Sequence, residues 1–242
     1  MSERFSQRMQ ELWEQAVPQA PALRALTLLR LGEPDAAMEE LANLPVGERD
    51  RRLLAVRERC LGSQFEANAI CPGCGARSEL LFACDDLRAD SAGSYEPLQV
   101  VYGDWTVRAR VPSTADLLAV ARPSAEAADA LLARCILGVE RAGERVAPDA
   151  LPTDVATAVE TAIANADPLG DISFDATCPS CGHDHTLSFD VVGYLWQEVD
   201  ARVERLLRDV HQLARAYGWA EADILALSDL RRRRYLELLA EA

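Results

Sequence analysis

Two short cysteine motifs decide the fold of this chain: Cys71-Pro72-Gly73-Cys74-Gly75 and Cys178-Pro179-Ser180-Cys181-Gly182. Each motif places two thiols three residues apart on a tight turn. Each also has glycine after the second cysteine, where the backbone can turn back and direct N–H groups at sulfur. Two such turns supply four sulfur ligands, a set that suits tetrahedral Zn²⁺. The pattern predicts one zinc ion bound by Cys71, Cys74, Cys178 and Cys181.

The predicted site is structural, because four thiolates leave no coordination position open for water or substrate. The two motifs lie far apart in the sequence, so the ion would join distant segments. By analogy with a disulfide that closes a loop of roughly 100 residues, this link would remove unfolded-state entropy worth about 4–5 kcal/mol. Iron in place of zinc, or a site without metal, is the first alternative. A redox dithiol is the second, and it is less favoured because neither motif opens a helix after a strand.

The remaining cysteines and the histidines have simpler interpretations. His183 and His185 follow the second motif and are alternative ligands, but four thiolates already complete the site, so we expect exposed loop residues. Cys60, Cys84 and Cys135 are expected to be buried thiols, since cysteine behaves as a small apolar residue.

The rest of the pattern predicts an α+β protein that is mostly helical. An N-terminal helical segment spans residues 1–62, and a C-terminal helical segment spans 192–242. Between them, residues 63–111 and 171–191 form a small antiparallel β module of zinc-ribbon type, interrupted by a helical insertion at 112–170. Residues 100–111 alternate around Gly103-Asp104, which indicates a β-hairpin.

Cap chemistry and apolar spacing place the helices. Pro112-Ser113-Thr114 is expected to cap a helix at 115–120, Pro123-Ser124 to precede one over about 124–140, and a third helix is expected over 152–166. An apolar stripe with helical spacing marks a long helix that ends at Gly218. Its members are Val192, Trp196, Val199, Val203, Leu206, Val210, Leu213 and Tyr217.

The formal net charge of the 242-residue chain is −14. Nucleic acids and anionic membranes are polyanions, so this charge disfavours both as partners. The N-terminus lacks the apolar core of a secretion signal, and no stretch approaches the length that spans a bilayer. We therefore expect a cytoplasmic protein, in which cysteines serve as metal ligands or buried thiols rather than disulfides.

Motifs of catalysis are absent from the sequence: it has no glycine-rich phosphate loop, nucleophile elbow or metalloprotease helix. We therefore expect no catalytic residues and no small-molecule substrate. The dense basic run Arg231-Arg232-Arg233-Arg234 covers all sides of a helix, and Asp229 and Glu237 are placed to pair with Arg233. This run is interpreted as a charged terminal helix, with contact to an acidic protein partner as the alternative.

Several segments resemble one protein family. The first is VHQLARAYGWAEADILAL at 210–227, followed by RRRRYL at 231–236. VPSTADLL at 111–118 and GERDRRLL at 47–54 are similar to the same group. These segments resemble baseplate or hub-assembly proteins of contractile-tailed phages and of phage-derived contractile injection systems. The likeness touches most of the chain and is most specific over residues 191–238.

The resemblance implies a non-enzymatic structural or assembly role at a baseplate hub, with other baseplate or hub proteins as partners and a place in the particle. It assigns no individual partner-binding residues. The alternative hypothesis is a zinc-ribbon adaptor that binds nucleic acid or transcription machinery, which the acidic charge opposes.

Overall fold

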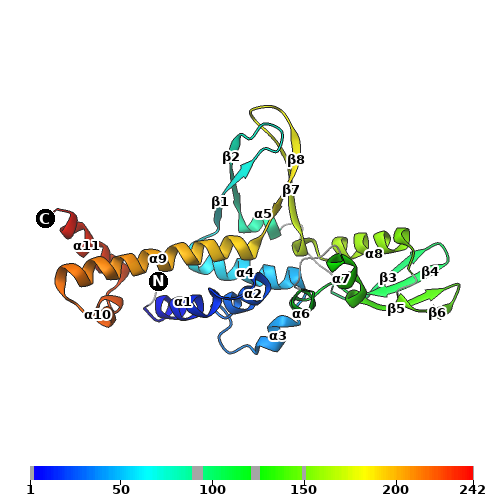
Figure 1. Ribbon diagram of the computed structural model, residues 1–242, viewed down its shortest axis with the longest axis horizontal. Helices are drawn as coiled ribbons and strands as arrows, with labels where there is room; N and C mark the ends of the chain where they lie inside the picture. Colours follow the sequence, from blue (N-terminus) through cyan, green and yellow to red (C-terminus); the bar gives the residue numbers. More distant parts are fainter. Residues whose placement is uncertain (1–2, 89–94, 121–125, 149–150, 242) are drawn as a thin grey trace. The chain divides into compact units, whose positions relative to one another are not determined.

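A computed structural model describes residues 3–88, 95–120, 126–148 and 151–241 (Figure 1). Helices form the larger part of the regular structure, and all strands belong to small antiparallel sheets, which confirms the predicted α+β class. The chain divides into two compact units, Met1–Asp35 with Val192–Ala242, and Ala36–Val191. The finer division into four segments stays a prediction.

The first unit is helical. Its described helices are α1 (Glu3–Ala16), α2 (Pro21–Leu29), α9 (Val191–Tyr217), α10 (Glu221–Leu225) and α11 (Asp229–Ala240). Trp13 of α1 donates its indole N–H to the Asp200 carboxylate of α9 at 2.7 Å. The Arg24 guanidinium of α2 lies 4.2 Å from the ring centre of Trp196. These polar contacts fix both short helices against the long one.

The predicted apolar stripe of α9 is buried along most of its length, from Val192 to Leu213. Two predicted members of the stripe are not fully buried. Trp196 is half-buried beneath Arg24, and Tyr217 is exposed and stacks on Trp219 with ring centres 4.7 Å apart. Gly218 follows the last helical residue, as expected.

The arginine run on α11 pairs differently from the prediction. Asp229 pairs with Arg232, and Glu237 pairs with Arg234 at 2.9 Å, rather than either pairing with Arg233. Arg232 is buried and also donates to the backbone carbonyl of Leu227 at 3.0 Å. One residue of the run therefore has a packing role, which its spacing did not reveal.

The second unit combines helices with eight strands in its described part. Its helices are α3 (Met38–Ala42), α4 (Val46–Leu61), α5 (Cys84–Arg88), α6 (Thr114–Ala119), α7 (Ala127–Cys135) and α8 (Thr153–Ala166), followed by the 3₁₀ turn η2 (Pro168–Gly170). Its strands are β1 (Gln64–Ile70), β2 (Arg77–Ala83), β3 (Leu98–Tyr102), β4 (Trp105–Ala109), β5 (Ile136–Arg141), β6 (Glu144–Val146), β7 (Ile172–Thr177) and β8 (Asp184–Phe189). They form two separate two-stranded hairpins, β1-β2 and β7-β8, and one four-stranded sheet ordered β3-β4-β5-β6.

The four-stranded sheet corrects part of the prediction. The hairpin expected near 100–111 is present as β3 and β4, but β4 pairs with β5, with Val107 opposite Val139. The helix expected over 124–140 ends at Cys135, where β5 begins, so the predicted helical insertion contains two strands. The predicted cap Pro123-Ser124 lies outside the described residues. One sheet face packs against Val155 and Val159 of α8.

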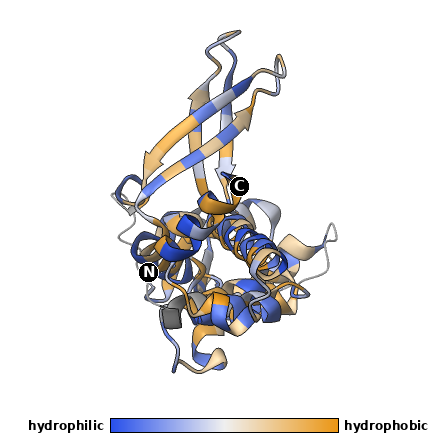
Figure 2. Cartoon of the chain, turned by 90° about the vertical axis from the view of Figure 1, so that its left-hand side faces the viewer, coloured by the Kyte–Doolittle hydropathy of each residue, from blue (hydrophilic) through white to orange (hydrophobic). Residues whose placement is uncertain are grey.

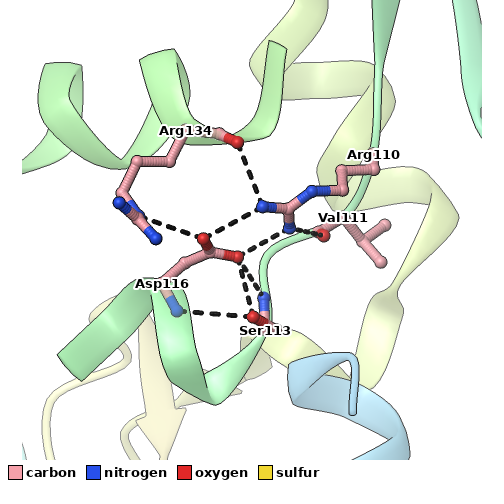
Figure 3. A network of polar contacts seen from close by, with 5 residues as sticks. All are labelled: Arg110, Val111, Ser113, Asp116 and Arg134. Atoms are coloured by element: carbon pink, nitrogen blue, oxygen red, sulfur yellow. Dashed lines mark hydrogen bonds and ion pairs between the residues drawn. The ribbon is translucent and has the colours of Figure 1, made fainter. Parts of the chain in front are cut away.

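A buried carboxylate joins α6 and α7 to the end of β4 (Figure 3). Within the predicted cap segment 112–114, Ser113 is the residue that caps α6, and it forms a reciprocal capping box with Asp116. The Arg110 guanidinium donates twice to Asp116, at 2.6 and 3.0 Å, and Arg134 of α7 donates at 3.0 Å. Burial alone would raise the pKa of Asp116, but the hydrogen bonds from Arg110 and Ser113 hold it well below its usual range.

Among the described residues, no helix combines the length and the apolar character that crossing a membrane requires. The longest of these, α9, carries charged residues from Glu198 onward.

Candidate metal centre

The two cysteine motifs are the turns of two β-hairpins that lie side by side (Figure 1). Cys71 and Cys74 lie between β1 and β2, whose register places Ile70 opposite Arg77. Cys178 and Cys181 lie between β7 and β8, whose register places Thr177 opposite Asp184. Hairpins that are distant in sequence therefore present matching cysteine turns at the same end.

Side chains alternate along each hairpin, so each has one inner and one outer face. Figure 2 shows apolar and polar bands alternating along these strands. The outer face of β7-β8 is polar, with Ser173 opposite Ser188 and Asp175 opposite Thr186. The inner faces carry apolar residues that include all four phenylalanines, and these bring the two hairpins together like a small sandwich, whereas Ile70 and Leu81 lie exposed on the outer face of β1-β2.

Four phenylalanines, one from each strand, join the hairpins at the end opposite the cysteines. Phe65 stacks on Phe82 with ring centres 4.8 Å apart, and Phe189 meets both edge-on at 5.3 and 5.1 Å. Phe174 completes the group at 5.3 Å from Phe82. The Arg57 guanidinium of α4 lies 3.8 Å from the Phe65 ring centre. This aromatic cluster fixes how the hairpins face each other, and the sequence reading missed it because its members are dispersed along the chain.

The two cysteine turns have the same backbone geometry. In the first, Gly75 N–H donates to the Cys71 carbonyl at 2.9 Å, and in the second Gly182 N–H donates to the Cys178 carbonyl at 2.9 Å. Gly75 and Gly182 have φ values of +73° and +72°, a region that other residues adopt only with strain. The predicted reversal of the backbone at the glycine after each cysteine pair is thereby confirmed.

The four sulfur atoms converge. All lie within 4.8 Å of one another, with Cys71 and Cys181 sulfurs 3.7 Å apart and Cys74 and Cys178 sulfurs 3.7 Å apart. These distances are far longer than a disulfide bond of about 2.05 Å. A tetrahedron with Zn–S bonds of about 2.3 Å has sulfurs about 3.8 Å apart. The cluster is compatible with a metal site, and Cys71 and Cys178 form its buried side.

Electrostatics also favour a cation among these sulfurs. The backbone N–H groups of Ser180 and Cys181 lower the pKa of the Cys178 thiol to about 6. The N–H of His183 acts on Cys181 in the same sense, but the neighbouring sulfurs raise the pKa of that thiol. Thiolates crowded this closely repel one another, and a cation at their centre removes the repulsion.

The histidines lie outside the sulfur cluster. His183 is an exposed loop residue, as expected, whereas His185 is half-buried on strand β8, because it continues the ladder opposite Ala176. His183 and His185 stack with ring centres 6.0 Å apart. His183 also packs on the first turn, because a Cβ atom added at Gly73 would lie 3.0 Å from its Cγ atom. His183 therefore contributes to the contact between the two turns. Of the other thiols, Cys84 and Cys135 are buried as predicted, whereas Cys60 is half-buried.

The contact between Gly73 and His183 gives a matched pair of variants. If the sulfur cluster binds a metal ion, Gly73→Ala should force the two turns apart by a few tenths of an ångström and weaken metal binding about fivefold, since mild overpacking costs about 1 kcal/mol. Ser180→Ala, at the equivalent position of the second turn, should leave the affinity unchanged. Competition titration with a chromogenic chelator measures both. His183→Ala should restore the affinity of Gly73→Ala, and failure of this rescue would contradict the proposed contact.

Comparison with known proteins gives one match. The family model of the T4 bacteriophage base plate protein matches residues 33–193, more than half of the chain and a range that contains both cysteine turns. No curated protein and no solved structure matches the chain. The chain belongs to the T4 bacteriophage base plate protein family.

Proposed function

We propose that this chain is a structural or assembly component of the baseplate or hub of a contractile phage tail or contractile injection system. We further propose that Cys71, Cys74, Cys178 and Cys181 bind one structural zinc ion. The observation that carries the proposal is the convergence of four sulfurs from two distant hairpins within the region that matches the base plate family. Membership of that family supplies the assembly context.

A structural zinc ion suits this site better than a catalytic one. Four thiolates fill a tetrahedral coordination sphere, so no position is left for water or substrate. The ion would hold the turns of the hairpins together, while the four phenylalanines hold their other ends. This arrangement favours a zinc-ribbon-like module, in which metal binding stabilises the fold. The role that follows is non-enzymatic, with no small-molecule substrate.

The partners that follow are other baseplate or hub proteins, which the chain would meet in the cytoplasm of the producing cell and then accompany into the particle. Binding of nucleic acid through the hairpins is disfavoured by their charge. Their strands carry Glu66, Glu79, Asp175 and Asp184 against Arg77 as the one arginine. The phosphate backbone would be repelled at this surface.

Purified particles from the producing strain test the proposal. Mass spectrometry of the particle should detect the chain, and elemental analysis of the purified protein should find one zinc per chain. Detection in assembly intermediates but not in finished particles would assign a transient assembly role. Absence from both would reject the baseplate proposal, and a protein without metal after purification under reducing conditions would reject the zinc site.

A further inference from the structure

An apolar groove lies between α7 and α8 of the second unit. It measures about 240 Å³, and its apolar wall includes Pro112, Leu131, Leu132, Cys135, Ile163 and Ala164. Burial raises the pKa of the Cys135 thiol to about 11, so this side chain stays neutral and contributes apolar surface. The groove therefore offers an apolar surface for an aliphatic chain. Such a surface stands out on a chain with a formal net charge of −14.

The polar residues at this groove are all acidic. Glu160, Asp167 and Asp171 line it, and no basic residue of the described chain does. Glu160 and Asp171 are exposed, whereas Asp167 is buried. An apolar groove with carboxylates and no cation is complementary to a ligand that has an apolar stem and a positive head.

Asp167 is only partly satisfied by the chain itself. One carboxylate oxygen accepts the backbone N–H of Gly47, at the start of α4, at 2.9 Å. The other oxygen is buried and has no hydrogen-bond partner in the described part of the chain. Burial raises the pKa of the Asp167 carboxyl, and the positive charge of Arg49 only partly opposes this, since the Arg49 guanidinium is engaged with Asp50 at 2.7 and 3.0 Å. The local negative charge at the groove is therefore not neutralised by a dedicated pair.

The size of the groove selects the kind of ligand. Sites for small molecules usually occupy about 300–1,000 Å³, so this groove is small for a cofactor or metabolite. A lysine or arginine side chain fits its chemistry, because the methylene stem can lie along Leu131, Leu132 and Ile163 while the cation stays near the carboxylates.

We propose that the groove between α7 and α8 is a docking site for a lysine or arginine side chain of a partner protein in the assembly. The inference rests on the proposed baseplate function for the identity of the assembly, but on the groove alone for the chemistry of the contact. Glu160 and Asp171 would attract the incoming cation, and the apolar wall would hold its stem.

Site-specific photo-cross-linking in the producing strain tests this proposal. A benzophenone side chain is placed at Ala164, which lines the groove, and separately at Ala130, an exposed alanine of α7 outside it. The Ala164 probe should cross-link a partner peptide with a lysine or arginine beside apolar residues, at a yield about tenfold above that of the Ala130 probe. A cross-link to an acidic segment, to nucleic acid, to a second copy of the chain or to its first unit would overturn the proposal.

Charge reversal gives the second test. Glu160→Lys should lower the cross-linking yield about tenfold, as expected when a favourable charge pair becomes a repulsive one. Glu144→Lys makes the same charge change on β6, outside the groove, and should leave the yield unchanged. Replacing the cross-linked basic residue of the partner by glutamate should restore the yield with Glu160→Lys.

The outcomes separate this inference from the proposed function. If the chain is found in particles but neither probe cross-links above background, the groove proposal fails while the baseplate role stands. If the chain is absent from particles and intermediates, the baseplate role fails. In that case an Ala164 cross-link to a basic segment of another protein would still support the groove.

Discussion

Cys178→Ser is expected to abolish zinc binding and to lower the free energy of unfolding by about 4 kcal/mol. The estimate follows from the loss of a link that closes a loop of roughly 100 residues. For a chain of this length the corresponding fall in Tm is about 10 °C. Elemental analysis and thermal unfolding under reducing conditions measure the two effects. Retention of full metal content and native Tm would reject the metal link.

Cys60→Ser is the matched control, because Cys60 is a thiol of the same unit that lies outside the sulfur cluster. It should keep one zinc per chain. A chelator should lower the Tm of the wild type to that of Cys178→Ser. The same chelator should leave the Tm of Cys178→Ser unchanged. This equality distinguishes loss of the ion from damage by the serine itself.

The aromatic cluster limits how much of the fold Cys178→Ser can disrupt. The four phenylalanines join the hairpins independently of the cysteines. We therefore expect the cysteine turns to separate while the aromatic cluster and the helices persist. Hydrogen exchange should rise at the turns and the adjoining ends of β1, β2, β7 and β8, with helical circular dichroism preserved at low temperature. Complete unfolding at low temperature would mean that the aromatic cluster does not hold without the metal.

Asp116→Ala is expected to destabilise the protein by about 3 kcal/mol at pH 7, because it removes a buried charge that serves three partners. Asp116 is 1% exposed and accepts hydrogen bonds from Arg110, Arg134 and the Ser113 cap. The two arginine side chains are 35% and 44% exposed, so water can solvate them after the carboxylate is lost. We therefore expect the loss of stability from Asp116→Ala to fall at the lower end of the range for breaking a buried ion pair.

Asp104→Ala provides the contrast. Asp104 pairs with Arg141 at 2.8 Å, but both side chains are about half exposed. Exposed pairs contribute about 0–1 kcal/mol, so this variant should unfold at nearly the same urea concentration as the wild type. Equal losses from the two substitutions would show that burial of Asp116 is not the source of its effect.

The Asp116 effect should depend on pH. The pKa of this carboxyl is lowered in the folded state, so its stabilisation is complete above the ordinary aspartate pKa of about 3.9. It is lost as the pH falls below that value toward the folded-state pKa. The stability gap between wild type and Asp116→Asn should therefore be constant from pH 5 to 7 and shrink below about pH 4. Urea unfolding across this range measures it, and a gap independent of pH would contradict the charged network.

The local geometry of the two cysteine turns follows from the sequence alone. A Cys-Pro-X-Cys-Gly motif is a turn whose hydrogen bonds and glycine φ value depend only on neighbouring residues, so both turns form as expected. The same holds for the Ser113 cap and for the strands flanking the cysteines, since caps and alternation are local signals.

The strand pairing of the four-stranded sheet could not be predicted from such local signals. Ile136-Leu137-Gly138-Val139 is a short apolar run that suits a helix or a strand, and it lies within the helix predicted over about 124–140. It is a strand because β4 offers it a partner, with Val107 opposite Val139. Strand pairing depends on residues distant in the sequence, and alternation alone does not specify which strands meet.

The combination of groups that are distant in the sequence depends on the folded chain. It brings four phenylalanines from four strands into one cluster and places the Asp167 carboxylate on the Gly47 N–H, 120 residues away. The apolar groove between α7 and α8, with its acidic residues, also exists only once these helices are packed. The geometry of a turn depends on a few adjacent residues. Packing and charge complementarity depend on contacts between distant residues, which no local pattern predicts.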